Sequence, residues 1–232
     1  MLKNKMIEEK PQKEELKERL DKVRNRLAVQ QMAVKEHKLP VIVLVEGWGT
    51  AGKGSMIGKI INNIDPRFFK VASLERIREE DLRKPFLWRY FTEIPEAGNF
   101  VFMDSGWMEE VTRARAAGEM DDKTYESRIA SIRHFERQLV DNGYLVVKFF
   151  LHISEKEQKK RIEALHENED TDWRINNSDF WQNKHYNKYF KVYDEYLDAT
   201  DSSTAPWYVI DASSKKWAEL QMLEFLTEGI DI

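Results

Sequence analysis

Apolar residues alternate along this chain between short continuous runs and longer stretches with helical spacing. The runs cover residues 41–45, 68–74, 100–104, 144–153 and 207–211. Short runs rich in β-branched and aromatic residues are typical of strands that are buried on both faces. Between the runs, apolar side chains recur every three or four residues, which predicts amphipathic helices. The alternation predicts an α/β fold with a doubly wound parallel sheet of about five strands and helices on both faces.

The N-terminal segment predicts one long amphipathic helix from residue 12 to about residue 36. It has no glycine or proline after Pro11, and its apolar stripe is formed by Leu16, Leu20, Val23, Leu27 and Val34. The polar face mixes acidic and basic side chains, so we expect the helix to lie on its own domain or on a partner subunit rather than on a membrane. The chain therefore divides into this segment, residues 1–38, and one domain, residues 39–232.

The C-terminal half holds a break in the helical pattern. Residues 167–179 are mostly polar and contain one tryptophan, Trp173, whereas an aromatic helix is predicted to run from Trp181 to Tyr196. A polar interruption of this kind, flanked by helices, is typical of a mobile loop or lid. We expect a helical lid at about residues 163–190.

The first strand runs directly into a glycine-rich turn that contains a lysine. Gly47 is followed after four residues by Gly52-Lys53-Gly54, and an apolar helix pattern begins after Ser55. This order of strand, loop and helix is typical of a P-loop, in which backbone N–H groups and a lysine bind phosphate oxygens. A glycine turn can also serve steric needs alone, but the lysine favours phosphate. The predicted phosphate-binding residues are Gly47, Gly49, Gly52, Lys53, Gly54 and Ser55.

Two features bear on a metal ion at this loop. The hydroxyl residue that usually follows the P-loop lysine and holds Mg²⁺ is replaced by Gly54. Metal binding at this loop therefore falls to Ser55, is arranged differently, or is weak. Asp104 ends the third strand and should lie at the same edge of the sheet as the loop, since ligands of parallel α/β sheets bind at the carboxyl ends of strands. We predict that Asp104 holds Mg²⁺, with a helix-capping role as the alternative.

Composition limits the classes of partner. The 232 residues carry 37 Lys and Arg against 41 Asp and Glu, a formal charge of −4, so no overall basic excess indicates a nucleic-acid partner. The chain has no cysteine and no apolar run of the roughly 20 residues that span a bilayer. We expect a cytoplasmic protein with no membrane partner.

Several short motifs occur together along the chain. They are Glu46-Gly47-Trp48 with Ala51-Gly52-Lys53-Gly54, then Asp65-Pro66-Arg67, Leu87-Trp88-Arg89 with Ile94-Pro95, Asp104 with Trp107, Trp173-Arg174 with Asp179, and Thr204-Ala205-Pro206-Trp207. In this order and at these spacings the chain resembles the polyphosphate kinase type 2 family. The members of that family are P-loop phosphotransferases that move a terminal phosphoryl group between inorganic polyphosphate and nucleotides.

The resemblance implies Mg²⁺, a local basic channel for polyphosphate, an adenine or guanine nucleotide, and a helical lid. It implies that Lys53 contacts phosphate and that Asp104 binds metal. Arg67, Arg89 and Arg115 become candidates for binding polyphosphate or the charge of the transition state, and Trp173 with Arg174 belongs to the lid. For each arginine an ordinary surface ion pair is the alternative. The N-terminal helix lies outside these motifs, and we expect a homo-oligomer.

The departures from the family pattern concern residues that would bind the metal ion or the phosphates. Gly49 stands where most members have an aspartate that shares Mg²⁺ with the strand-end aspartate, and Ser105 stands where they have an arginine. Thr92 replaces a frequent arginine, and Asp172 replaces a lysine before the lid tryptophan. In these respects the chain resembles the degenerate domain of the tandem-domain members.

Three functions follow as hypotheses. The first is a polyphosphate-dependent nucleotide phosphotransferase acting on AMP or ADP, or in reverse as a polyphosphate synthase. The second is a catalytically impaired domain of the same family that binds polyphosphate or nucleotide. The third is a small-molecule or nucleoside kinase that uses ATP as its donor.

Overall fold

The structure, a computed structural model, describes residues 1–2, 10–74 and 77–231. Residues 3–9 of the predicted N-terminal segment, residues 75 and 76, and residue 232 lie outside the described residues. The strands form one all-parallel sheet in the order β2-β3-β1-β4-β5. Their bounds are β1 Val41–Gly47, β2 Phe69–Ser73, β3 Phe100–Asp104, β4 Leu145–His152 and β5 Trp207–Asp211. The predicted five-stranded parallel sheet is confirmed.

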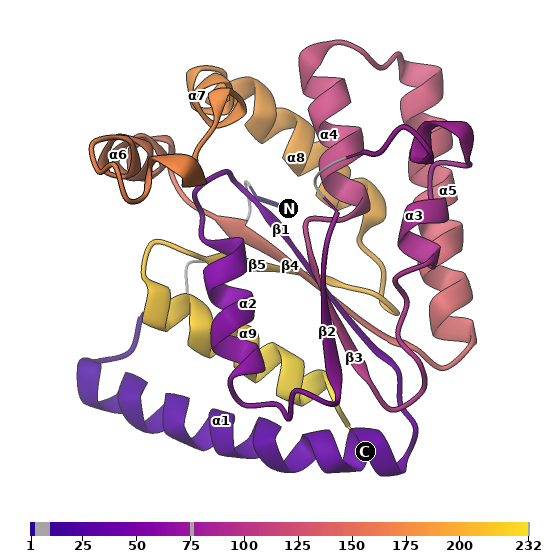
Figure 1. Cartoon of the computed structure of the whole chain (residues 1–232), viewed down its shortest axis with the longest axis vertical. Coiled ribbons are helices and arrows are strands. Elements are labelled where there is room, and N and C mark those ends of the chain that lie inside the picture. Colours follow the sequence, from indigo (N-terminus) through magenta and orange to yellow (C-terminus); the bar gives the residue numbers. More distant parts are fainter. Residues whose placement is uncertain (3–9, 75–76, 232) are drawn as a thin grey trace.

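Helices cover both faces of this sheet (Figure 1). α2 and α9 pack on one face, and α4, α5 and α8 form the layer on the other. The helix bounds are α1 Lys13–Glu36, α2 Lys53–Ile61, α3 Trp88–Phe91, α4 Trp107–Ala117, α5 Asp122–Asp141, α6 Glu155–His166, α7 Asn177–Lys184, α8 Tyr186–Thr200 and α9 Lys215–Gly229. Two short 3₁₀ turns lie at Asp81–Arg83 and Asp172–Arg174.

The central strands are apolar because helices cover both faces of the sheet. The first six residues of β1 are buried, and six consecutive residues of β4 are buried as well. β1 pairs with β3 on one side and with β4 on the other, with Val41 opposite both Phe100 and Leu145. Because the chain continues from β1 to one side of the sheet and later returns to the other, the carboxyl end of β1 is the switch point of the fold, where ligands of such sheets bind.

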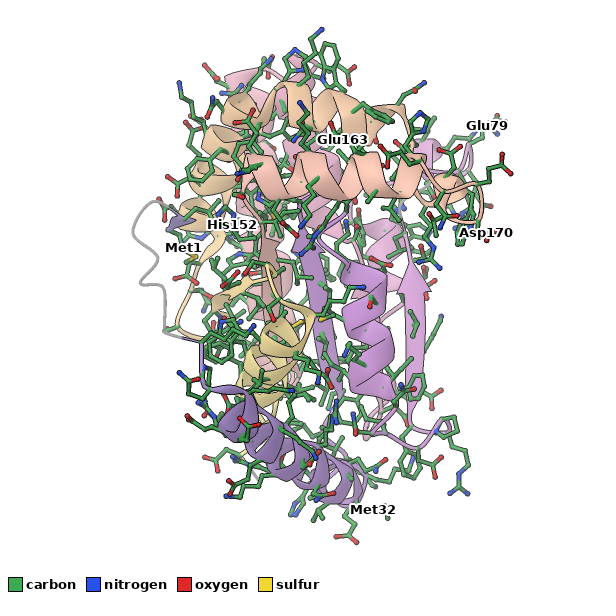
Figure 2. The ribbon with its side chains drawn as sticks, turned by 90° about the vertical axis from the view of Figure 1, so that its left-hand side faces the viewer. Met1, Met32, Glu79, His152, Glu163 and Asp170 are labelled. Atoms are coloured by element: carbon green, nitrogen blue, oxygen red, sulfur yellow. The ribbon has the colours of Figure 1, made fainter. Side chains whose placement is uncertain are left out.

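α1 packs along α9, at the opposite end of the molecule from α6 (Figures 1 and 2). Leu27 is fully buried, and the Arg19 guanidinium binds Glu224 at 2.9 Å. Glu219 of α9 is 1% exposed and forms ion pairs with both Arg24 and Lys59. A buried carboxylate is costly unless it is paired, so Arg24 favours the position of α1 on α9, and Lys59 favours the position of α2 on the same helix. The apolar stripe of α1 is therefore covered within this chain.

One helical prediction needs correction. The aromatic helix predicted from Trp181 to Tyr196 is divided at His185 into α7 and α8. Asn176 and Asp179 form a capping box that starts α7 inside the predicted polar loop. This helix ends after about two turns, where the backbone of His185 leaves the helical conformation at φ −113° and ψ 29°. None of the described helices combines the length and apolar character that crossing a bilayer requires.

Candidate functional site

The glycine-rich turn leaves β1 at the switch point and enters α2, as predicted. Gly47 has a φ of 141°, and a Cβ atom there would collide with the backbone carbonyl of Leu151 on β4. Gly52 has a left-handed φ of 97° and precedes Lys53, the first residue of α2. Thr50 also has a positive φ, 60°, which is strained for a residue with a branched Cβ. The loop thus has the tight backbone that aims N–H groups of a helix start at an anion.

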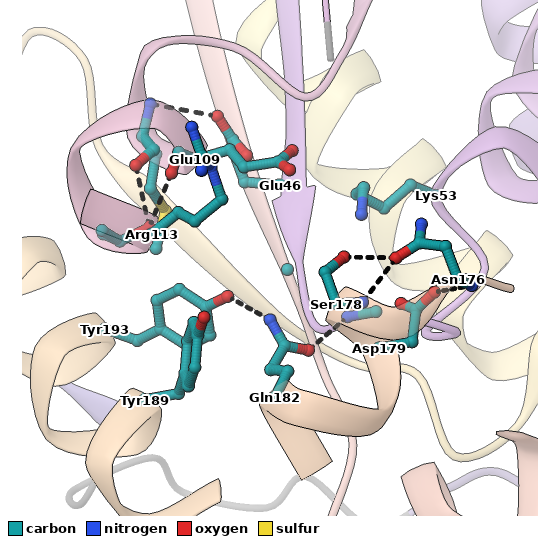
Figure 3. Close-up of a pocket in the computed structure, with 14 residues that line it drawn as sticks. Glu46, Lys53, Glu109, Arg113, Asn176, Ser178, Asp179, Gln182, Tyr189 and Tyr193 are labelled. Carbon is teal, nitrogen blue, oxygen red and sulfur yellow. Dashed lines mark hydrogen bonds between the residues drawn. The ribbon is translucent and has the colours of Figure 1, made fainter. Parts of the chain in front are cut away.

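A cavity of about 90 Å³ lies over this loop, between α4 and the helices α7 and α8 (Figure 3). Its lining comes from four elements that are distant in sequence. The β1–α2 region gives Glu46, Gly47, Gly49 and Lys53; α4 gives Met108, Glu109, Thr112 and Arg113; α7 and its cap give Asn176, Ser178, Asp179 and Gln182; and α8 gives Tyr189 and Tyr193. The lining is strongly polar, with three carboxyl groups and two cations.

Asp104 lies beside the first turn of α2. A Cβ atom on Gly54 would be 3.2 Å from its Oδ2, while its Oδ1 is buried without a hydrogen-bond partner. Burial raises the pKa of Asp104, and the charge of Lys53 opposes that rise. A carboxylate oxygen that is buried and unsatisfied at the carboxyl edge of the sheet fits the ligand chemistry of Mg²⁺. Among the described residues, no group of three or more His, Cys, Asp or Glu is arranged to hold a metal, so this chain offers few ligands of its own.

Glu46 is a second carboxyl group at a strand end. It is 2% exposed, and its Oε1 accepts hydrogen bonds from the backbone N–H groups of Gly106 at 2.8 Å and Met108 at 3.2 Å. Burial raises the pKa of Glu46 to about 8, and the charge of Glu109 adds to the rise. The side chain caps the N-terminus of α4 and so fixes that helix against the phosphate loop.

Glutamine side chains join the loop to α6 and α7. The N–H of Gly49 donates to Oε1 of Gln182 at 2.8 Å. Nε2 of Gln158 donates to the same Oε1 at 2.7 Å and to the carbonyl of Gly49 at 3.3 Å. Nε2 of Gln182 then donates to the hydroxyl of Tyr193 at 2.7 Å. On α6, the guanidinium of Arg161 binds the carbonyl oxygens of Thr50 at 3.3 Å and Ala51 at 3.2 Å.

Arg89 lies in a smaller pocket next to the first. It is 4% exposed, lies with its guanidinium 5.4 Å from the centre of the Tyr90 ring, and lines this pocket together with Ser105 and Arg113. Arg113 lines both pockets, which places one cation between the phosphate loop and the carboxyl ends of β2 and β3.

The other predicted arginines lie elsewhere. The guanidinium of Arg115 binds Asp122 and the carbonyl oxygen of Met120 and does not line either pocket. Arg67 forms an exposed ion pair with Asp65 at 2.7 Å, before the start of β2. Since Lys53 follows the carboxyl end of β1, Arg67 lies at the opposite edge of the parallel sheet. For both residues the structure has the ordinary ion pair instead of a place beside the loop.

The predicted lid tryptophan lies on the surface. Trp173 is 77% exposed, its Nε1 donates to the carbonyl of Asp170, and the guanidinium of Arg174 lies 5.2 Å from its ring centre. Neither residue lines the cavity over Lys53. Ser55, on the first turn of α2, is likewise exposed and lies outside the lining.

Sequence reasoning placed Glu46 and Asp179 in motifs but gave neither a role, and it did not name Glu109, Arg113 or Gln182 as site residues. A role for Glu46 could have been predicted, because this residue lies at the end of an apolar strand just as Asp104 does. Glu109, Arg113 and Gln182 carry no comparable local signal, because the approach of α4 and α7 to the loop places them there.

Most of the chain matches known proteins. Residues 10–232 match the family model described as polyphosphate kinase 2. The chain is 31% identical over 194 residues to a polyphosphate:AMP phosphotransferase of Pseudomonas aeruginosa, covering 83% of this chain and 39% of that protein. It is 28% identical over 205 residues to an AMP/ADP-polyphosphate phosphotransferase of Meiothermus ruber, covering 87% of this chain and 77% of that protein.

A solved structure of this family has the same fold as this chain. The crystal structure of polyphosphate kinase 2 from Arthrobacter aurescens TC1 superimposes with a TM-score of 0.90 at 27% identity, over 95% of this chain and 80% of that one. This chain thus spans about two fifths of the Pseudomonas relative and most of the Arthrobacter chain. With the family model matched over nearly its full length, the chain belongs to the polyphosphate kinase 2 family.

Proposed function

We propose that this chain transfers a terminal phosphoryl group between inorganic polyphosphate and a nucleotide, AMP or ADP or a guanine counterpart, in either direction. The observation that carries the proposal is that Lys53, at the start of α2, lies close enough to Asp104, at the end of β3, for its charge to act on that carboxyl group at the carboxyl edge of the sheet. The printed activities of the Pseudomonas and Meiothermus relatives support the substrate class.

Phosphoryl transfer asks a protein mainly for positioning and for cations placed on the developing charge. In this chain the N–H groups at the start of α2 would bind the phosphate oxygens, and Lys53 would neutralise their charge. Arg113 and Arg89 lie beside that position and would bind the neighbouring phosphates of a polyphosphate chain.

Asp104 would hold Mg²⁺ through its buried Oδ1, with water and phosphate completing the coordination. The ion, when bound, supplies positive charge to the oxygens of the transferred group.

The lid must move for substrate to enter. The cavity over the loop is about 90 Å³, whereas sites for drug-sized ligands are about 300 to 1,000 Å³. α7 forms the wall nearest the loop, so displacement of α7 is the direct way to enlarge the site.

An assay of the purified chain tests the proposal. The chain is incubated with polyphosphate and Mg²⁺ and with AMP, ADP, GMP or GDP in turn, and phosphorylated nucleotide is measured. We expect product from at least one nucleotide, its loss in Lys53→Ala, and its retention in Lys216→Ala, which removes an exposed lysine of α9. Turnover with none of the nucleotides would contradict the proposal.

One observation favours a second function, a domain that binds polyphosphate or nucleotide without turnover. Gly49 lacks a side chain, and a carboxylate there would meet Asp179 and Gln182 of the lid. In that case the wild-type chain binds polyphosphate in a pull-down or calorimetric measurement but makes no product. The same assay separates the two functions.

We also propose that the chain forms a homo-oligomer. α1 leaves Val29 73% exposed and Met32 50% exposed on the side away from α9, which is the apolar surface a partner copy could cover. Light scattering of the wild type should show a mass above 27.6 kDa, and Val29→Glu with Met32→Glu should reduce it. A monomeric wild type would contradict this.

A further inference from the structure

Lid helix α7 sits directly on the phosphate loop. The N–H of Gly49 is one of the loop donors available to an anion, and in this structure it donates to Oε1 of Gln182 at 2.8 Å. The same oxygen accepts from Gln158 at 2.7 Å, and Nε2 of Gln182 donates to Tyr193 at 2.7 Å, so the amide of Gln182 is held on both sides. A loop donor is therefore already satisfied by a side chain of the lid.

Asp179 brings a carboxyl group to the same place. Its Oδ2 accepts from the N–H of Asn176 at 3.0 Å in the capping box, which fixes the rotamer and turns Oδ1 toward Gly49. Figure 3 shows Asp179 and Lys53 at the same side of the cavity. Burial raises the pKa of Asp179, and its hydrogen bond from Asn176 and then the charge of Lys53 oppose the rise. The lysine of the loop thus faces an acidic group of the lid.

Gly49 is what allows this approach. A Cβ atom at position 49 would collide with Oδ1 of Asp179 and lie 3.1 Å from Oε1 of Gln182. Unlike Gly47 and Gly52, Gly49 does not have a left-handed φ, so its backbone would accept another residue. The three atoms nearest to that Cβ position all belong to Asp179 and Gln182 of α7.

We propose that Asp179 and Gln182 form a latch that closes the phosphate loop in the absence of ligand and that phosphate must displace. The latch occupies two positions that a bound anion would use. Gln182 accepts the hydrogen bond of the Gly49 N–H, and Asp179 presents an acidic group beside Lys53. A phosphate chain entering the loop competes for the N–H and is repelled by the carboxylate. The inference rests on the proposed function only in that the loop binds phosphate.

The closed state is tested first without any ligand. Hydrogen exchange is measured at α7, residues 177–184, in the wild type, in Gly49→Ala and in Gly58→Ala. Gly58 lies on α2 with no atom within 4 Å of its Cβ position, so it is a matched control. We expect exchange of α7 about tenfold faster in Gly49→Ala and unchanged in Gly58→Ala, because the methyl group pushes the latch open. Equal exchange of α7 in all three proteins would overturn the latch.

Competition is tested with tripolyphosphate in the presence of Mg²⁺. Affinity is measured by calorimetry for the wild type, Asp179→Asn, Gln182→Ala and the control Asp170→Asn. Asparagine retains an acceptor for the Asn176 cap, and Asp170 is an exposed carboxylate of the same lid, at its outer edge (Figure 2). We expect Asp179→Asn to bind about tenfold more tightly, Gln182→Ala to bind more tightly to a lesser degree, and Asp170→Asn to match the wild type.

The outcomes separate the latch from the proposed function. Weaker or unchanged binding in both Asp179→Asn and Gln182→Ala would show that the lid contacts do not compete with phosphate and would overturn the latch. Tighter binding in these variants without any turnover would support the latch while contradicting the proposed catalytic function. Absence of tripolyphosphate binding in all four proteins would contradict both.

Discussion

Asp179 of the lid faces Gly49 of the phosphate loop so closely that no side chain fits between them. The two residues are 130 positions apart, and the contact exists because the capping box starts α7 at Asn177 and aims its first turn at the loop. In the sequence, Gly49 looks like the loss of a carboxylate. In the fold, it is the residue of the loop that α7 contacts.

An aspartate placed at position 49 alone should therefore displace α7 rather than bind a metal ion. We expect Gly49→Asp to unfold at a lower temperature than the wild type, because two carboxyl groups would be forced together in a half-buried position. Thermal unfolding measures this. In Gly49→Asp combined with Asp179→Ala, we expect the melting temperature to recover part of the loss, and no recovery would contradict the assigned contact.

Glu46 should make stability depend on pH. Its pKa in the folded protein is about 8, above its ordinary value of 4.5, so the folded state holds a proton that the unfolded state releases. The stabilisation is complete below about pH 4.5 and is lost as the pH rises toward 8. In Glu46→Gln, which keeps the acceptor for Gly106 and Met108, we expect the loss to be absent.

Urea unfolding at pH 5 and pH 8 checks this prediction. The free energy of unfolding of Glu46→Gln relative to the wild type should rise between the two pH values by on the order of a few kcal/mol. Glu167→Gln, which removes an exposed carboxylate after α6, serves as the control. The same pH slope in Glu46→Gln and the wild type would show that Glu46 is ionised in the fold.

Lys148 and Glu136 form an ion pair inside the domain. Nζ of Lys148 lies 2.7 Å from Oε2 of Glu136 and 2.8 Å from the carbonyl of Thr200, and the two side chains are 0% and 3% exposed. Removing one partner leaves a buried charge, so we expect Lys148→Met to lower the free energy of unfolding by about 3 to 5 kcal/mol. In Lys148→Met with Glu136→Gln most of this loss should disappear, which a double-mutant cycle from urea unfolding measures. Additive losses would contradict the pairing.

Arg113 and Arg115 are expected to differ in activity. Arg113 lines the cavity over Lys53, whereas Arg115 binds Asp122 and Met120 away from it. We expect Arg113→Ala to lower kcat/KM for polyphosphate at least tenfold, since one cation near the transferred group is lost, and Arg115→Ala to change it less than threefold. Steady-state assays at matched concentrations of folded protein measure kcat/KM for the two variants. A larger loss in Arg115→Ala would contradict the site as described.

The sheet and the phosphate loop could be predicted from local pattern alone. Strands covered on both faces leave continuous apolar runs, and the turn from β1 to α2 needs Gly47 and Gly52 for reasons of φ and close approach. The position of Asp104 at the carboxyl edge of the sheet could be predicted because a carboxylate at the end of an apolar strand is itself a local signal. These features depend on neighbours in sequence.

The rest of the site depends on which way helices face. Arg113 and Arg115 are two residues apart on α4, and at about 3.6 residues per turn they lie on nearly opposite sides of the helix. A motif does not say which side meets the loop. Likewise Gln182 was expected only as part of a continuous aromatic helix, and the break at His185 is what directs it to Gly49.

Phosphorus NMR of one reaction mixture tests the central claim most directly. The wild-type chain, polyphosphate, Mg²⁺ and ADP are followed over time, with Lys53→Ala in a parallel sample. The proposed function predicts that the resonance of the terminal polyphosphate groups changes as a γ-phosphate resonance of ATP grows, and that neither change occurs with Lys53→Ala. An unchanged spectrum for the wild type, repeated with AMP and with GDP, would contradict phosphoryl transfer by this chain.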